Sequence, residues 1–399
     1  MIVEKSNGDF SSLATKLSTP LCAHQSMQAA ETRQEVFVLE KSLFTPAHIS
    51  SLTFGHAGHL FAGSDDGSLR VYDLSSFKVL KAIRGLGAEV SSIICVKRPG
   101  SELRDAWIAH GKTISKFQLA SEKMIQSPED ALVTLAAGDG ENDILNELAL
   151  NADKSNLAFS LDSGVVGVVD LVNDNTITRM EEKHTSVCGS VKYVPDRPRE
   201  LISGGYDTFL FHFDTAQNKV ISRRQIGTST DAFAATNGMA LSPPFIMSLA
   251  VSVTGVLAAG TADGRLWIGF GGEKSPNTTA RSSKKRAKKW DGLNEDESLL
   301  IKVAEGPIVA MAFTGPRRLT TSTLMGVITQ YLLIYEEGKD SVLLQQLWQK
   351  ESTGLEKVNA LVADEKRIIV GGFSSKGLGV IEIWKQDVPV PEKVAEVQK

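Results

Sequence analysis

His184, Ser203 and Asp207 are residues of the types that perform nucleophilic catalysis, and they lie close together in the sequence. A serine nucleophile, a histidine base and an orienting carboxylate form the Ser-His-Asp triad of acyl-transfer enzymes. The motifs that usually accompany such chemistry do not accompany these residues: the chain has neither a Gly-x-Ser-x-Gly elbow nor a glycine-rich phosphate loop between a strand and a helix. Whether these three residues have a catalytic or a structural role therefore depends on the elements that position them.

All three residues fall within one stretch, Lys183 to Asp214, which has the pattern strand, turn, strand, tight turn, strand. Similar units recur along most of the chain, and about seven of them at roughly forty residues each match the period of a four-stranded repeat. The other units span His48–Gly85, Ala88–Gln126, Asp143–Lys183, Phe245–Phe270, Gly306–Glu337 and Glu356–Trp384.

Short segments rich in Val, Ile, Leu and Phe, separated by Gly, Asp, Asn and Ser turns, predict an all-β protein. A single four-stranded sheet cannot bury both of its faces, whereas sheets arranged radially bury them against each other. We therefore expect a seven-bladed β-propeller. The last unit ends at Trp384 without an outer strand, so we expect residues 35–39 (EVFVL) to supply that strand and close the ring.

The unit beginning at Lys183 resembles the WD repeat, and the chain is similar to WD-repeat propellers over residues 31 to about 386. In that family the turn aspartate accepts hydrogen bonds from the preceding histidine and from turn amides, and a serine extends the network. The resemblance gives these roles to Asp207, His184 and Ser203, and the turn position to Asp66 and Asp263 in units without an equivalent histidine. A satisfied buried network rigidifies a blade, so we interpret these residues as structural.

Three stretches narrow the resemblance to one subgroup of these propellers: AHGKTIS (109–115), residues 145–171 and residues 183–207. Members of this subgroup are regarded as candidate substrate receptors of the cullin-4 ubiquitin ligase, docked through its propeller adaptor. Such receptors often carry a Trp-Asp-x-Arg motif at the end of a third strand. The sequences YDLS (72–75), VDLV (169–172) and FDTA (213–216) all lack that arginine, which puts the docking role in doubt.

The composition is that of a soluble globular protein, with 42% hydrophobic and 23% charged residues and a formal net charge of −4. The N-terminus does not resemble a secretory signal, and no apolar run is long enough to span a membrane. Three cysteines without paired or metal-like spacing suit a reducing compartment. We expect an intracellular protein of the nucleus, the cytoplasm or both, without cofactor, metal or membrane.

Residues 1–30 are expected to form a flexible arm and residues 387–399 a C-terminal tail, with the propeller at 31–386. Residues 271–298 are expected to form a disordered basic insertion in the fifth unit. This insertion could be a nuclear-import signal, an RNA contact aided by stacking of Trp290, or a solvated loop without further function. Its basic run consists of Lys284, Lys285, Arg286, Lys288 and Lys289.

The repeat architecture favours a non-enzymatic scaffold that binds partner proteins on a rim of the ring. The alternatives are a cullin-4 substrate receptor, and a nuclear factor that contacts RNA or chromatin through the basic run. A propeller hydrolase would need acids and histidines from several blades to converge on a water-filled central channel. We expect Trp107 and Trp384 to pack in the core.

Overall fold

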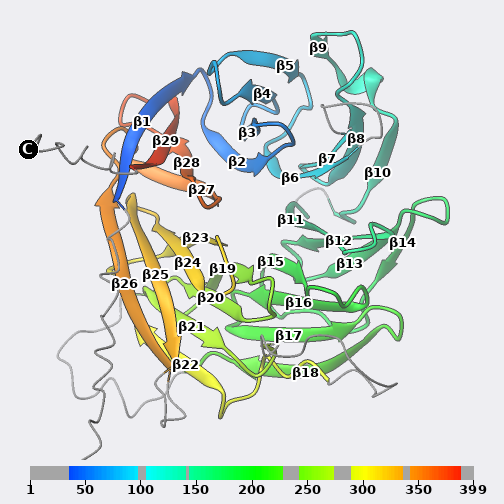
Figure 1. Ribbon diagram of the computed structural model, residues 1–399. Coiled ribbons are helices and arrows are strands. Elements are labelled where there is room, and N and C mark those ends of the chain that lie inside the picture. Colours follow the sequence, from blue (N-terminus) through cyan, green and yellow to red (C-terminus); the bar gives the residue numbers. More distant parts are fainter. Residues whose placement is uncertain are drawn as a thin grey trace, which may run out of the picture. The chain divides into compact units, whose positions relative to one another are not determined.

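The computed structural model describes residues 36–97, 105–140, 143–227, 242–273, 289–335 and 342–387. The chain divides into two units, Met1–Gln34 and Glu35–Lys399, and every described residue belongs to the second. Its described residues form seven sheets arranged as blades around a centre, each with four antiparallel strands (Figure 1). Among the described residues, no helix has the length and apolar character needed to cross a membrane.

The first four blades each run outward from an inner strand next to the centre. Blade one is β2 (Ile49–Phe54), β3 (His59–Ser64), β4 (Leu69–Asp73) and β5 (Val79–Ile83), and blade two is β6 (Val90–Val96), β7 (Asp105–His110), β8 (Thr113–Gln118) and β10 (Val133–Ala136). Blade three is β11 (Leu145–Leu150), β12 (Asn156–Leu161), β13 (Val166–Asp170) and β14 (Thr176–Arg179), and blade four is β15 (Cys188–Tyr193), β16 (Glu200–Gly205), β17 (Phe209–Asp214) and β18 (Lys219–Gln225).

The last three blades follow the same plan, and blade seven takes its outer strand from the beginning of the described chain. Blade five is β19 (Ile246–Val251), β20 (Leu257–Thr261), β21 (Arg265–Gly269) and β22 (Ser298–Lys302), and blade six is β23 (Ile308–Phe313), β24 (Arg318–Thr323), β25 (Val327–Tyr335) and β26 (Val342–Glu351). Blade seven is β27 (Lys357–Ala363), β28 (Arg367–Phe373), β29 (Gly379–Asp387) and β1 (Val36–Thr45).

The predicted closing strand is confirmed. Strand β1 pairs antiparallel with β29, from Val36 opposite Asp387 to Thr45 opposite Gly379. It is longer than the five residues expected from the sequence, because the ladder continues past a register shift between Leu39 and Lys41. Figure 1 shows β1 lying beside β29, so that the two ends of the described chain close one blade.

The second repeat unit differs from its sequence-based boundary. The unit was expected to end at Gln126, but its outer strand is β10, which begins at Val133. The intervening strand β9 (Ile125–Gln126) pairs in parallel with β5 and becomes the fifth strand of blade one. A short 3₁₀ helix, η1 (Pro128–Asp130), carries the chain back to blade two. Strand β9 therefore covers part of the outer edge of blade one, whereas no fifth strand is present in the other blades as far as their residues are described.

The core lies between the blades, in apolar clusters of described residues that each join two neighbours around the ring. Trp107 lies in the cluster between blades two and three and Trp384 in the cluster between blades six and seven, so both tryptophans are core residues as predicted. This pattern is the physical reason for the ring, because each sheet buries its two faces against the next sheet and the previous one.

Each inner strand has a register shift near its first paired residue. The same irregularity therefore recurs in all seven described blades. A β-bulge of this kind inserts an unpaired residue and re-aims its side chain. The bulged positions include Ser50, Gly189, Met247 and Asn359, and all four line the central channel. The sequence repeat thus fixes which residues face the centre of the ring.

Candidate interaction surface

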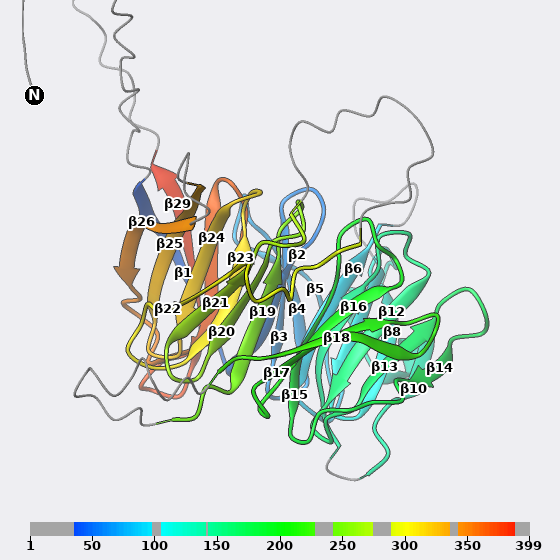
Figure 2. The same cartoon turned by 90° about the horizontal axis from the view of Figure 1, so that it is seen from below.

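One edge of the ring, here called the upper rim, carries the tight turn between the second and third strands of every blade. It also carries the connections that lead into the inner strands; the opposite edge is called the lower rim. Figure 2 shows the ring turned by 90°, with the strands running between these two edges. In blade four the amide of Tyr206 donates to Val187 O at 2.8 Å, and in blade one Asp65 donates to His48 O at 3.1 Å. The same backbone bond ties turn to connection in both blades.

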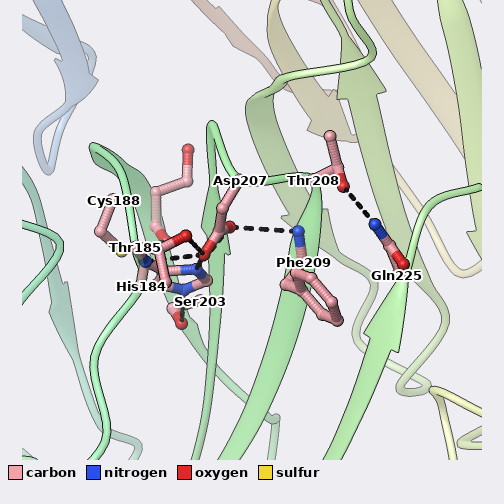
Figure 3. Close-up of polar contacts among 9 residues, drawn as sticks. His184, Thr185, Cys188, Ser203, Asp207, Thr208, Phe209 and Gln225 are labelled. Atoms are coloured by element: carbon pink, nitrogen blue, oxygen red, sulfur yellow. Dashed lines mark hydrogen bonds and ion pairs between the residues drawn. The ribbon is translucent and has the colours of Figure 1, made fainter.

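In blade four the structure brings His184, Ser203 and Asp207 together (Figure 3). His184 Nδ1 lies 2.9 Å from Asp207 Oδ1, and its Nε2 lies 2.7 Å from Ser203 Oγ. Asp207 also accepts from the amides of Thr185 at 2.9 Å and Phe209 at 3.2 Å. The histidine ring stacks on Phe211, with ring centroids 4.3 Å apart. The network therefore fastens the connection before β15 to the turn between β16 and β17.

This arrangement has the order of a catalytic triad, but burial separates it from any substrate. Ser203 is 0% exposed and His184 is 1% exposed. A nucleophile must reach a substrate carbonyl, which a fully buried hydroxyl cannot do. Burial tends to raise the pKa of Asp207, but the bonds from His184, Thr185 and Phe209 outweigh it and lower that pKa. The carboxylate therefore stays charged at neutral pH and serves as the acceptor at the centre of the network.

Asp66 occupies the corresponding turn of blade one, but the structure does not bring it to a histidine. Among the described residues, its exposed carboxylate accepts from the Ser68 amide at 3.0 Å and from the Ser68 hydroxyl at 2.6 Å. The neighbouring Asp65 makes the long-range contact instead, with His48 Nδ1 at 3.1 Å. His48 stacks on Phe373 of blade seven, with centroids 4.3 Å apart. Sequence spacing missed this pair because His48 lies immediately before its strand.

Asp263 of blade five is paired with a cation, although its unit lacks the histidine. Arg265 Nε lies 2.6 Å from Asp263 Oδ2, and Thr261 Oγ1 donates to Oδ1 at 2.5 Å. Both charged side chains are buried, with 8% and 5% of their surfaces exposed. Arg265 Nη1 also donates to Gly227 O at 3.2 Å, which ties the turn to the chain leaving blade four. The sequence feature that could have predicted this ion pair is the spacing Asp-x-Arg of Asp263 and Arg265.

Blade seven uses a carboxylate that the sequence analysis did not identify. Glu382 in β29 is 0% exposed. Its Oε1 accepts from the Gly354 amide at 2.6 Å and from the Thr353 amide and hydroxyl at 3.2 Å each. The residue stands in the third strand and not in the turn, so the repeat pattern gave no reason to select it. It holds the connection between β26 and β27 in place.

The central channel encloses about 520 Å³ and is lined by the inner strands of all seven blades. The charged residues among its described lining are Glu147 and Lys192, which form an ion pair with each other. Glu147 Oε2 also accepts from the Val191 amide at 2.9 Å. No histidine is among the described lining residues. In the same part of the chain, no three His, Cys, Asp or Glu side chains gather as metal ligands would.

Most of the basic run lies outside the described residues, namely Lys284, Lys285, Arg286 and Lys288. Lys289 is described and exposed. Trp290 does not have the role considered for it: it is 2% exposed, its indole N–H donates to Gly255 O at 3.0 Å, and its ring meets His212 edge-on at 4.8 Å. It packs with Leu293 between blades four and five. The Trp290 indole therefore cannot stack on a base, because it is buried in the space between blades four and five.

Comparison with known proteins agrees with this architecture. The family model described as "WD domain, G-beta repeat" matches residues 39–73, which span the end of β1 to the end of β4. The chain is also similar to the WD repeat-containing protein 53 homolog of Dictyostelium discoideum, at 22% identity over 163 residues. That alignment covers 41% of this chain and 42% of the relative, less than half of either protein. The matched repeat and the seven blades closed by β1 make the chain similar to WD-repeat β-propellers in sequence and in architecture.

Proposed function

We propose that the chain is a non-enzymatic scaffold whose partner proteins bind the upper rim of the propeller. WD-repeat propellers are typical protein-interaction scaffolds. The observation that carries the choice of rim is that buried side chains fix its connections differently from blade to blade. Blade four uses His184 and Asp207, blade five Arg265 and Asp263, and blade seven Glu382. A rigid ring that holds varied connections in fixed positions is suited to selecting a partner.

The experiment is site-specific photocrosslinking in the cells of origin. A photoreactive amino acid is placed at Asp66 or Lys376 on the upper rim, and in matched variants at the exposed Val172 or Val253 on the lower rim. We expect protein adducts from the upper positions and few from the lower ones. Adducts from the lower positions alone would contradict the proposal, and an absence of protein adducts from either rim would refute the scaffold itself.

A narrower proposal is that the scaffold is a substrate receptor of a cullin-4 ubiquitin ligase. It is supported by the resemblance of three stretches to a subgroup of WD-repeat proteins. It is opposed at the lower rim, where the turns after Asp73, Asp170 and Asp214 carry Ser75, Val172 and Ala216 in place of the arginine. Co-precipitation with the ligase adaptor is the test, and capture of a stable complex without the adaptor counts against the receptor role.

A location in the nucleus is proposed from the basic run alone. The test is a deletion within the basic run that leaves Trp290 in place. A deletion that removed Trp290 would also disrupt the packing between blades four and five. Deletion of residues 281–288 spares Lys289 and Trp290. Loss of nuclear accumulation and of RNA retention in that variant would support a nuclear factor. Unchanged location and RNA retention would leave the run without this function.

A further inference from the structure

A glycine interrupts the ring of side chains that lines the channel. Gly189 is the bulged residue of β15, and a Cβ built on it would lie 3.3 Å from Cε1 of Tyr206 and 3.7 Å from Ile246 O. The Tyr206 ring therefore lies close beside position 189, and a side chain there would be in tight contact with it. The tyrosine belongs to the upper turn of blade four, and its ring lies beside Gly189, which lines the channel.

Tyr206 is one half of an aromatic pair. Its ring stacks on Phe245 of the connection into blade five, with centroids 5.5 Å apart and planes 15° apart. Both backbones are held: the Tyr206 amide donates to Val187 O at 2.8 Å, and Phe245 O accepts from Ala262 at 2.9 Å. Both side chains are half-buried, so the pair is a fixed platform with part of its surface open to solvent.

A carboxylate lies on the blade-three side of this platform. Asp162, in the upper turn of blade three, accepts at Oδ1 from Asn146 Nδ2 at 2.9 Å, and Asn146 lines the channel. Asn146 Nδ2 also donates to Cys188 O at 3.1 Å, so it links the carboxylate to the residue directly before Gly189. Burial and, to a lesser degree, the Asp162 charge raise the pKa of Tyr206. No cation among the described residues forms an ion pair with Asp162.

The aromatic pair and the Asp162 carboxylate together favour the binding of a cation. A ring face attracts a guanidinium or ammonium group, and the Asp162 carboxylate adds negative charge that no described residue neutralises through an ion pair. The same carboxylate repels phosphates, which disfavours a nucleic acid stacked on the rings. Arginine fits better than lysine because its planar, weakly hydrated group can stack on a ring and donate to a carboxylate at once.

We infer that Asp162, Tyr206 and Phe245, around Gly189, form the part of the upper rim that recognises an arginine side chain of a partner protein. This inference rests on the proposed scaffold function and names the chemistry of its site. The guanidinium stacks on Tyr206 and pairs with Asp162, while the partner backbone runs across the upper rim. Arginine does not enter the channel to pair with Glu147, because Lys192 already occupies that carboxylate.

The test uses the full chain and short fluorescein-labelled peptides of Gly, Ser and Ala with one central arginine. Matched peptides carry lysine, citrulline or glutamate at that position. Fluorescence anisotropy should give an order of binding of arginine, then lysine, then citrulline. We expect arginine to bind at least about tenfold more tightly than citrulline, since the charge is lost while the planar shape is kept. Equal binding of citrulline, or no binding of the arginine peptide, would overturn the inference.

Variants of the chain identify the site. Asp162→Asn and Tyr206→Leu should each weaken arginine-peptide binding about five- to tenfold, whereas Tyr206→Phe keeps the ring and should bind normally. Asp139→Asn is the matched control, because Asp139 is an upper-rim acid that is 73% exposed and paired with Arg179. Thermal melts of all variants verify folding. Binding that is unchanged in Asp162→Asn, or a single-stranded oligonucleotide that depends on the same residues, would contradict the assignment.

Failure of this inference can be told from failure of the scaffold proposal. Photocrosslinking from Asp66 or Lys376 is repeated in the Asp162→Asn background. Loss of the protein adducts supports the arginine site. Adducts that persist at full yield leave the scaffold proposal intact and reject the arginine site, whereas adducts missing already in the unsubstituted chain reject the scaffold proposal.

Discussion

Ile49 of blade one packs against Gly371 of blade seven, so residues near opposite ends of the described chain meet at the closing interface. A Cβ built on Gly371 would lie 2.6 Å from Cγ2 of Ile49. The same relationship joins Gly63 to Val90 and Gly260 to Ile308 between consecutive blades, at 2.5 Å and 2.7 Å. In each case a residue without a side chain in the second strand receives the first residue of the next inner strand. The closing interface is therefore built like the interfaces between blades one and two and between blades five and six.

The Gly371→Ala substitution should destabilise the ring by about 1–3 kcal/mol, because the new methyl group overlaps Ile49 in a packed interface. Chemical denaturation measures the change. Gly315→Ala is the matched control: nothing lies within 4 Å of a Cβ built there, and its stability should stay within about 0.5 kcal/mol of the unsubstituted chain. Equal effects of the two substitutions would contradict the packing described for Gly371.

Removing the acceptor of the blade-four network should cost about 1–3 kcal/mol in Asp207→Ala, because His184 and the amides of Thr185 and Phe209 lose their partner. Asp66→Ala provides the comparison at the equivalent turn. Asp66 is exposed and, within the described part of the chain, its carboxylate bonds to Ser68 alone, so its loss should cost less than about 1 kcal/mol. Unchanged thermal stability of Asp207→Ala would argue against a structural role for the network.

The same carboxylate predicts an acid dependence of stability. Because the pKa of Asp207 is lower in the folded state, the unfolded state binds more protons in acid. The contribution of Asp207 is therefore complete above its unfolded pKa of about 3.9 and is lost as the pH falls through its lower folded pKa. Unfolding free energies measured from about pH 6 down to about pH 3 should fall less steeply in Asp207→Asn than in the unsubstituted chain. Identical slopes would contradict the assignment of the shift to Asp207.

The stability of the closing strand β1 should depend on the side chain of Phe37. Phe37 is 1% exposed and meets the Trp348 ring edge-on at 5.5 Å, and Trp348 meets Trp384 at 5.8 Å. Phe37→Ala should cost about 3–5 kcal/mol through the cavity that it leaves between blades six and seven. The neighbouring Val38 is 45% exposed, and Val38→Ala should change stability by less than about 1 kcal/mol. Urea denaturation of both variants distinguishes an anchored strand from one held by backbone pairing alone.

Much of the fold could be predicted because its determinants are local. Alternating apolar residues bounded by Gly, Asp and Asn define strands and turns, and their period of about forty residues gives the number of blades. The unpaired last unit and the apolar segment before the first unit together predicted the closing strand. The buried network of blade four could be predicted for the same reason. His184, Ser203 and Asp207 belong to one repeat unit, so their spacing in the sequence determines how they lie in the blade.

Tertiary structure alone decided which groups meet across blades. The sequence pattern selected Asp66, yet Asp65 reaches His48, because the orientation of the turn determines which carboxylate faces the neighbouring connection. Trp290 adjoins a basic run, but the widening space between blades four and five buries it. Tyr206, Phe245 and Asp162 come from three different blades. Repeat periodicity sets each blade, whereas contacts between blades depend on distances across the ring that no local pattern encodes.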